Sequence, residues 1–211
     1  MSVIRQLSLL GADAAPPEPE DLAGLLLAGG RITRYGDSAQ VTVDVGHPWR
    51  SAAIVTECGR RGLAATSTSA VTGTSGADGD EGDDGATSTS GAAQLSVRTA
   101  YAAALVGLAQ AWTDDVGLRV PRGLQLDGRV LRLWAMAVGH RDGSAYVLPI
   151  SGPDQVFRDA VGAALASVGL VAQLVSRREV TFRIVGKRRL DRLVEMVGDP
   201  PKQAPPDIWP S

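Results

Sequence analysis

The chain has 211 residues and a mass of 21.9 kDa, enough for one or two modest domains. Hydrophobic residues make up 44% of it, so the chain can bury a core, and the low aromatic content of 4% argues against binding single-stranded nucleic acid by serial base stacking. Cys58 is the single cysteine, which excludes an internal disulfide and favours a cytoplasmic protein. With two histidines and one cysteine, a zinc site would need carboxylates to complete it. We therefore expect no metal and no other cofactor.

No segment is predicted to cross a membrane, because the longest apolar stretches, residues 22–30 and 100–109, are well short of about 20 residues. Residues 1–17 begin with a short apolar run, but Asp13 and a Pro-rich acidic stretch follow at once, unlike a secretory signal. They are expected to form an N-terminal arm that packs on the domain.

The net charge of −2 conceals an uneven distribution. Residues 78–84 carry five acidic residues, and the rest of the chain carries 21 basic against 18 acidic ones. Seven basic and two acidic residues lie between Arg177 and Arg192. This cluster fits either a solvated face or a phosphate-binding surface.

Residues 66–93 consist of Gly, Ser, Thr, Ala and acidic residues, with Val71 as the one large aliphatic side chain. Such a composition buries too little apolar surface to offset the entropy of ordering, so it predicts a disordered loop. The acidic run lacks the closing glutamate and flanking helices of an EF-hand, which argues against calcium binding.

The rest of the chain divides into two similar halves, residues 18–113 and 128–198, joined by a connector of residues 114–127. The first half is predicted to contain helices over 18–30, 48–62 and 99–113 and strands over 31–35, 40–45, 63–66 and 92–98. The second is predicted to contain helices over 131–139, 153–168 and 187–197 and strands over 144–150, 171–177 and 180–185. The second strand of its first hairpin is expected to be missing or very short, and Asp142 and Gly143 are expected to end its first helix.

Matching features of the halves recur at similar offsets, Pro48 with Pro153, Gly62 with Gly169 and Gly30 with Gly143, which indicates a duplication. The predicted fold is therefore α+β, with two αββαββα halves related by a pseudo-twofold axis in a monomer.

Residues 22–30, LAGLLLAGG, resemble the signature helix of the LAGLIDADG homing-endonuclease family, and the order of elements in each half is similar to that fold. Within that family, the chain resembles the WhiA-type sporulation regulators of actinobacteria and their Gram-positive relatives, which carry a degenerate LAGLIDADG domain and a helix-turn-helix domain. The resemblance covers most of residues 18–198. It does not extend to the helix-turn-helix domain, since only the Pro-rich tail, residues 199–211, follows.

The resemblance implies that the two signature helices pack side by side through small residues and that the antiparallel sheets form a saddle. The small residues at the matching spacing are Gly24 and Ala28 in the first half and Ala135 and Gly139 in the second. The alternative is a pair of ordinary core helices that contain Ala and Gly.

In that family, one acid from the end of each signature helix holds the metal ions for phosphodiester hydrolysis. The matching position is Gly29 in the first half and Asp142 in the second. One acid cannot build a symmetric metal clamp, and Asp142 fits a turn residue as well, with His140 nearby as a surface residue or a metal ligand. We therefore expect Asp142 to be vestigial and catalysis to be lost, and we expect the protein not to be an enzyme.

The resemblance also implies that the hairpins enter the major groove of duplex DNA. Alternation places Arg98 and Arg183 on the polar faces of their strands, and arginine can pair with guanine or phosphate. The expected DNA contacts are Arg31, Arg34, Arg98, Arg177, Arg178, Arg183, Lys187, Arg188 and Arg189.

The sequence thus predicts a non-catalytic duplex-DNA-binding protein, a transcriptional or developmental regulator in the cytoplasm at the nucleoid. The alternatives are a protein-interaction module on the same fold and a residual metal-dependent endonuclease. Trp209 in the tail is expected either to pack back on the domain or to dock a protein partner.

Overall fold

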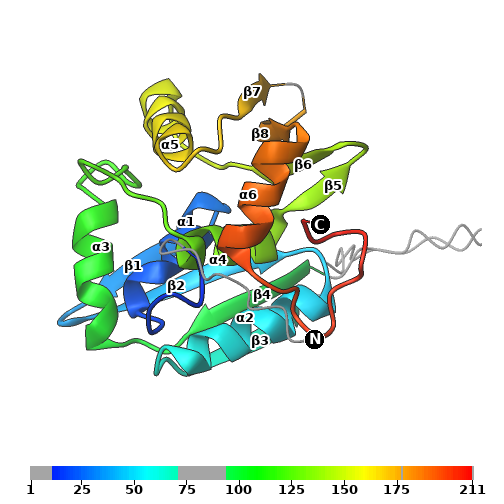
Figure 1. Ribbon diagram of the computed structural model, residues 1–211. Coiled ribbons are helices and arrows are strands. Elements are labelled where there is room, and N and C mark those ends of the chain that lie inside the picture. Colours follow the sequence, from blue (N-terminus) through cyan, green and yellow to red (C-terminus); the bar gives the residue numbers. More distant parts are fainter. Residues whose placement is uncertain (1–10, 71–93, 177, 211) are drawn as a thin grey trace, which may run out of the picture.

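Two four-stranded antiparallel sheets with the same strand order form the framework of the protein (Figure 1). The computed structural model describes residues 11–70, 94–176 and 178–210. The first sheet has the order β1-β2-β4-β3 and the second the order β5-β6-β8-β7. The strands are β1 (Arg31–Tyr35), β2 (Ser38–Val45), β3 (Ala65–Ala70), β4 (Gln94–Thr99), β5 (His140–Asp142), β6 (Ala145–Pro149), β7 (Gln173–Ser176) and β8 (Val180–Val185).

Helices precede, interrupt and follow the strands in the same places in both halves. Each half is therefore roughly αββαββα, and the predicted α+β duplication is confirmed. The helices of the first half are η1 (Pro19–Leu22), α1 (Ala23–Leu27), α2 (Pro48–Arg60), η2 (Ala103–Leu105) and α3 (Val106–Trp112). Those of the second half are α4 (Gly128–Val138), α5 (Gln155–Ser167) and α6 (Lys187–Val197).

Local sequence explains where several elements begin and end. Pro48 opens α2 at a position where its missing N–H has no intrahelical partner, and Gly62 follows the helix with a φ of +70° that favours glycine. The Asp127 carboxylate caps α4 by accepting from the backbone N–H groups of Arg129 and Val130. Asp154 caps α5 by accepting from the Phe157 N–H.

The first hairpin of the second half was predicted incorrectly. Helix α4 ends at Val138 and strand β5 begins at His140, so Asp142 lies in a strand and does not end the helix. The short strand is therefore the first of the hairpin, β5, and not the second. Gly139 precedes β5 as Gly30 precedes β1, so the glycine that matches Gly30 is Gly139, where the sequence suggested Gly143.

Two further boundaries differ from the expectation. Strand β3 runs to Ala70 and pairs with β4 along its length, so residues 66–70 belong to the sheet rather than to a loop. The last helix of the first half is η2 followed by α3, which starts later than residue 99 because Ala102 pairs with Ala39 in extended conformation. Most of the predicted loop, residues 71–93, and residues 1–10 of the predicted arm lie outside the described residues.

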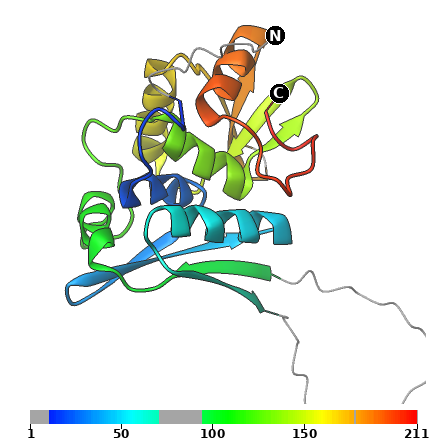
Figure 2. The same ribbon diagram turned by 60° about the horizontal axis from the view of Figure 1, so that its bottom comes forward.

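The core lies on one side of each sheet. In β2, Val41, Val43 and Val45 are buried toward the helices, and the alternate residues face the other way. Figure 2 shows α1 and α2 lying on this side of the first sheet, with no described element over its other side. In the second sheet, Phe182 faces the core, where its ring packs edge-on against Trp134 of α4.

The two halves meet where α1 packs against α4. A Cβ atom on Gly24 would lie 2.2 Å from the Val130 carbonyl oxygen, 2.9 Å from the Trp134 nitrogen and 3.0 Å from the Leu133 Cβ. Glycine is therefore what lets these two helices approach so closely.

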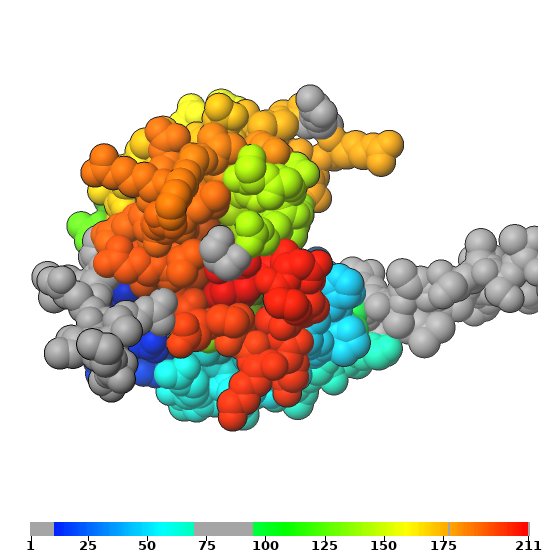
Figure 3. Space-filling model, turned by 45° about the vertical axis from the view of Figure 1, so that its right-hand side comes forward, coloured from blue at the N-terminus to red at the C-terminus, as the bar shows by residue number. Residues whose placement is uncertain are grey.

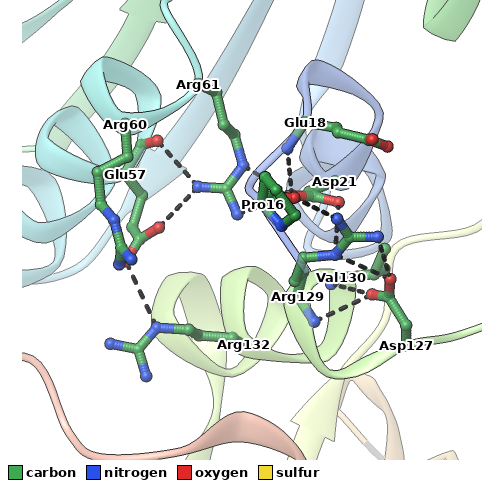
Figure 4. A network of polar contacts seen from close by, with 10 residues as sticks. All are labelled: Pro16, Glu18, Asp21, Glu57, Arg60, Arg61, Asp127, Arg129, Val130 and Arg132. Atoms are coloured by element: carbon green, nitrogen blue, oxygen red, sulfur yellow. Dashed lines mark hydrogen bonds and ion pairs between the residues drawn. The ribbon is translucent and has the colours of Figure 1, made fainter. Parts of the chain in front are cut away.

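A buried ionic network also connects η1, α2 and α4 (Figure 4). Arg61, which follows α2, forms ion pairs of 3.0 Å with Asp21 and 2.6 Å with Glu57, and all three side chains are buried. Asp21 also pairs with Arg129 at 3.4 Å, and Glu57 with Arg132 at 3.4 Å, which brings in α4. The network holds the halves together with charges that have little access to water.

The C-terminal tail packs back on the domain. Of the two alternatives considered for Trp209, packing on the domain and docking a protein partner, the structure shows the first. The Trp209 ring is buried, donates from Nε1 to the Gly198 carbonyl at 2.9 Å and lies under the Arg132 guanidinium. Figure 3 shows the tail, in red, on the surface beside α6. None of the described helices is long and apolar enough to cross a membrane.

Candidate nucleic-acid interface

The side of each sheet that faces away from the helices, here called its outer face, carries one row of four residues directly opposite one another. On the first sheet the row is Arg31, Thr42, Arg98 and Thr66, across β1, β2, β4 and β3. On the second sheet it is His140, Val147, Arg183 and Gln173, across β5, β6, β8 and β7. Because the strand orders are the same, Arg98 and Arg183 occupy equivalent positions in the two halves.

The two equivalent arginines have different surroundings. The Arg98 side chain is exposed and makes no hydrogen bond or ion pair with any described residue, while its main chain belongs to β4, which is paired with β2 and β3. Arg183 forms an ion pair with the Asp142 carboxylate, and its Nη2 also donates to the Asp142 carbonyl at 3.3 Å. Thr33 occupies the first-sheet position that Asp142 occupies in the second, two residues after the row in β1 and β5 respectively.

The ion pair crosses strand β6. Asp142 lies opposite Ala145, and Arg183 lies opposite Val147, so the guanidinium passes diagonally over the strand between them. Both Ala145 and Val147 are buried although they point to the outer face. The hydrogen bond from Arg183, followed by the charges of Arg183 and His140, holds the pKa of Asp142 below its ordinary value, so Asp142 is ionised at neutral pH.

The outer face of the second sheet lines a hollow of about 1060 Å³. It brings the Asp142–Arg183 pair together with two charged residues from the β7–β8 turn, Arg178 and Glu179. Its positive and negative side chains are therefore nearly balanced. The residues that line it are His140, Asp142, Val147, Gln173, Val175, Arg178, Glu179, Thr181 and Arg183.

The first hairpin places its two predicted contacts on opposite faces. Arg31 lies on the outer face, with one nitrogen 3.8 Å from the Asp44 carboxylate. Arg34 pairs with Ala39, which is buried toward the helices, so Arg34 points to the other side of the sheet. Arg177 lies outside the described residues.

The basic start of α6 forms a separate surface. Lys187, Arg188 and Arg189 line a hollow of about 780 Å³ that shares no residue with the hollow on the second sheet. Lys187 pairs with Asp191 at 3.0 Å, and Arg189 donates to the Val185 carbonyl at 3.2 Å. The structure therefore does not bring these three residues together with Arg183 in one hollow.

The C-terminal ends of α1 and α4 carry no matched pair of acidic residues. Gly29 lies two residues before β1, and the equivalent residue two before β5 is Val138. Asp142, expected at that position, lies four residues further along on the outer face of the second sheet. The space beside Gly29 is filled by Ser151, whose Oγ would be 2.9 Å from a Cβ atom at residue 29.

A buried arginine lies at the end of α4. Arg50 of α2 donates to the carbonyl oxygens of Ala135 at 3.2 Å, Met136 at 2.7 Å and Gly139 at 2.6 Å. These carbonyls belong to the last turn of α4 and the residue after it, where the helix dipole is negative. Burial lowers the pKa of Arg50.

Sequence reasoning missed Arg50, because its partners lie more than 80 residues away along the chain. The centre of the neighbouring Trp49 ring lies 4.6 Å from the Arg50 guanidinium carbon. The Tyr146 hydroxyl and Trp49 Nε1 are buried without a hydrogen-bond partner among the described residues. Gly139 leaves room for Tyr146, since a Cβ atom there would lie 2.4 Å from the hydroxyl.

Four small residues were expected to form the contact between the two signature helices. Of these, Gly24 contacts α4, while the atoms nearest to Gly139 belong to its own half.

Within residues 11–70, 94–176 and 178–210, no three His, Cys, Asp or Glu side chains come together in a way that could hold a metal ion. Comparison with known protein families finds no match to this sequence. A search of curated proteins finds no significant relative.

Proposed function

We propose that the protein binds duplex DNA through the outer faces of its two sheets and does not cleave it. The observation that carries the proposal is the equivalence of Arg98 and Arg183, one at the same row position on each outer face. Two antiparallel sheets related by a pseudo-twofold axis can place such residues against successive segments of a groove, as other β-ribbon proteins do. The duplicated αββαββα order supports the same proposal through its resemblance to the LAGLIDADG fold.

The side chains at the helix ends support binding without hydrolysis. Neither Gly29 nor Val138 can supply a carboxylate, and the Arg50 guanidinium at the end of α4 would repel a metal cation. Asp142 is already engaged by Arg183. A regulatory role, such as transcriptional or developmental control, is the part of the proposal that rests on the resemblance to WhiA-type regulators.

Fluorescence polarisation with labelled duplexes at two salt concentrations tests the proposal. Wild-type protein should bind with an affinity that falls as salt rises. The double variant Arg98→Ala with Arg183→Ala should lose detectable binding at moderate salt and keep its melting temperature. Absence of salt-dependent binding by the wild type would refute the proposal.

The matched control is the double variant Arg34→Ala with Arg122→Ala, since Arg34 faces away from the outer face and Arg122 is an exposed residue of the connector. It removes the same charge, so equal loss of binding would show general electrostatics and no defined surface. Incubation of the protein and duplex DNA with Mg²⁺ or Mn²⁺ tests the proposal that the protein does not cleave DNA. Strand cleavage by the wild type that Asp142→Asn eliminates would overturn that part of the proposal.

A protein-interaction module is the second candidate, and one surface favours it. A hollow of about 750 Å³ lies between residues 114–124 and α5. Val116 and Val156 beside it are 98% and 76% exposed, which is high for large apolar side chains. Val116→Asp with Val156→Asp would abolish binding to a protein partner and leave DNA binding unchanged.

A further inference from the structure

The asymmetry between the two equivalent arginines carries an inference that rests on the proposed function. We propose that Asp142 is a positioning residue that holds Arg183 as a reader of guanine, while Arg98 contacts the phosphate backbone. The partner is then a non-palindromic duplex with a guanine in the half that the second sheet contacts.

The first step is geometric. Arg183 has two contacts with one residue, from separate nitrogens to the carboxylate and to the main-chain carbonyl of Asp142. Two contacts fix both the position and the plane of the guanidinium, and the buried Ala145 and Val147 lie beneath it. A fixed guanidinium plane is what bidentate pairing with guanine O6 and N7 requires.

The second step concerns charge. A phosphate contact gains from an unopposed positive charge, because binding is driven by the release of counterions. The ionised Asp142 cancels most of that gain at Arg183, and Glu179 opposes Arg178 in the same hollow. A carboxylate beside a DNA-facing arginine is therefore unfavourable for phosphate binding and useful for orientation.

The third step is the internal comparison that the duplication provides. Arg98 has the same row position as Arg183, yet the position of Asp142 is taken in the first sheet by Thr33. A threonine hydroxyl carries no charge, and the guanidinium of Arg98 has no hydrogen bond to any described residue. Arg98 thus keeps its full charge and its rotational freedom, which suit contact with phosphate.

The differences along the rows extend this asymmetry to the target. Arg31 and Thr66 at the ends of the first row correspond to His140 and Gln173 at the ends of the second. Equivalent positions in the two halves therefore offer different donors and acceptors to the groove. A palindromic site would be read by unlike surfaces, so the preferred site is non-palindromic.

The test begins with selection of bound duplexes from a randomised library by the wild-type protein. The selected duplex and its single-base variants are then compared in polarisation assays with wild type, Asp142→Asn and Asp44→Asn. Asp44→Asn is the matched control because it also removes one outer-face carboxylate, 3.8 Å from Arg31 on the first sheet.

Asp142→Asn should lower the preference for the guanine at least tenfold and leave or raise the affinity for unrelated duplexes. Asp44→Asn should raise affinity for all sequences alike and keep the preference. Arg183→Lys, which keeps the charge and loses the fork, should behave as Asp142→Asn does. Thr33→Asp gives Arg98 a carboxylate at the equivalent position and should make the affinity for DNA depend less steeply on salt concentration.

Four outcomes overturn all or part of the inference, and they differ in what they say of the proposed function. Salt-dependent binding without an enriched guanine, or an Asp142→Asn variant that keeps the full preference, refutes the positioning role and leaves DNA binding in place. Enrichment of a palindrome refutes the asymmetric target alone. Failure of the wild type to bind any duplex at low salt refutes both.

Discussion

Gly24 of α1 lies so close to Val130 of α4 that a Cβ atom at residue 24 would come within 2.2 Å of the Val130 carbonyl oxygen. The nearest neighbours of that atom include main-chain atoms of α4, which cannot rotate away. The close crossing of these two helices therefore depends on the absence of a side chain at one residue, and it joins the two halves of the duplication.

Gly24→Ala should force α1 and α4 apart and lower the free energy of unfolding by about 1–3 kcal/mol, as overpacking of a core does. Gly59→Ala is the matched control. Gly59 also lies in a helix, α2, but a Cβ atom there would meet nothing within 4 Å, so this change should stabilise by about 0.5–1 kcal/mol. Urea unfolding of both variants measures the difference, and equal effects would contradict the helix contact.

Arg50→Met should remove the donors that satisfy three carbonyls at the end of α4. Buried carbonyls without partners and the loss of a cation at a helix C-terminus should together lower the free energy of unfolding by about 2–4 kcal/mol. Arg50→Lys keeps the charge but has one nitrogen in place of a fork, so it should fall between wild type and Arg50→Met. A Lys variant as unstable as the Met variant would show that the geometry of the fork matters and the charge does not.

The parts of the fold that the sequence predicted are those with a strong local signal. The alternation of Val41, Val43 and Val45 located β2, and Pro48 and Gly62 located the ends of α2. Helix α6 has the predicted bounds, Lys187–Val197, because its apolar residues repeat at helical spacing.

The parts that were missed depend on tertiary contacts. Strand β5 has three residues and only polar side chains, so it carries no alternation to detect. The end of β3 is rich in Ser and Thr and reads as a loop, but Ser67 lies opposite Val97, and its hydroxyl oxygen accepts a hydrogen bond from the Ser51 hydroxyl of α2. Both strands form because a neighbouring strand satisfies their main chain.

The features of the candidate site also divide into those that a local signal predicted and those that depend on tertiary contacts. Alternation alone placed Arg98 and Arg183 on the outer faces, because it needs only the strand period of two. The ion pair between Asp142 and Arg183 needed the strand order, since the two residues lie on strands separated by β6. Arg50 gave no local signal, because its role depends entirely on where α4 ends.

Glu57→Gln should destabilise the protein by about 3–5 kcal/mol, because among the described residues it leaves the buried Arg61 with only Asp21 as an anionic partner. The matched control is Asp191→Asn, which removes the carboxylate from the exposed pair with Lys187 and should change stability by less than about 0.5 kcal/mol. Thermal and urea unfolding measure both changes. A loss below 1 kcal/mol for Glu57→Gln would mean that the network adds no stability.

The same network predicts how stability depends on pH. Burial alone would raise the pKa of Glu57, but the hydrogen bond and charge of Arg61, with Arg132 and Arg60, outweigh burial and bring the pKa below the ordinary 4.5. Glu57 therefore stabilises the fold above about pH 4.5, and this stabilisation disappears as the pH falls through the lowered pKa. Unfolding free energies between pH 3 and 7 should fall less steeply on acidification for Glu57→Gln than for wild type.

Asp21 should show the opposite dependence, because burial, acting against the Glu18 N–H and the charges of Arg61 and Arg129, raises its pKa above the ordinary 3.8. Its ionised form is thus less favourable in the folded state, and its removal should steepen the loss on acidification. Asp21→Asn and Glu57→Gln measured side by side should change the acid slope in opposite directions. Changes in the same direction would contradict this assignment.

Replacement of residues 71–93 by a two-residue Asn-Gly turn should leave the melting temperature within a few degrees. Ala70 and Gln94 lie directly opposite one another at the ends of β3 and β4, so a short turn can join them without moving either strand. The replaced segment contains five acidic residues and no basic one, so the net charge changes from −2 to +3. If the outer faces bind DNA, the shortened protein should bind duplexes more tightly at low salt and with a steeper salt dependence.

The matched control keeps the length of this segment and changes only its charge, by replacing Asp78, Asp80, Glu81, Asp83 and Asp84 with their amides. Tighter binding by both variants, measured by polarisation at two salt concentrations, assigns the effect to the negative charge of the segment. Tighter binding by the shortened variant alone assigns it to steric hindrance. A drop of more than about 10 °C in the melting temperature of the shortened variant would contradict the prediction, because a loss of that size in a chain of this length corresponds to several kcal/mol of stabilising contacts.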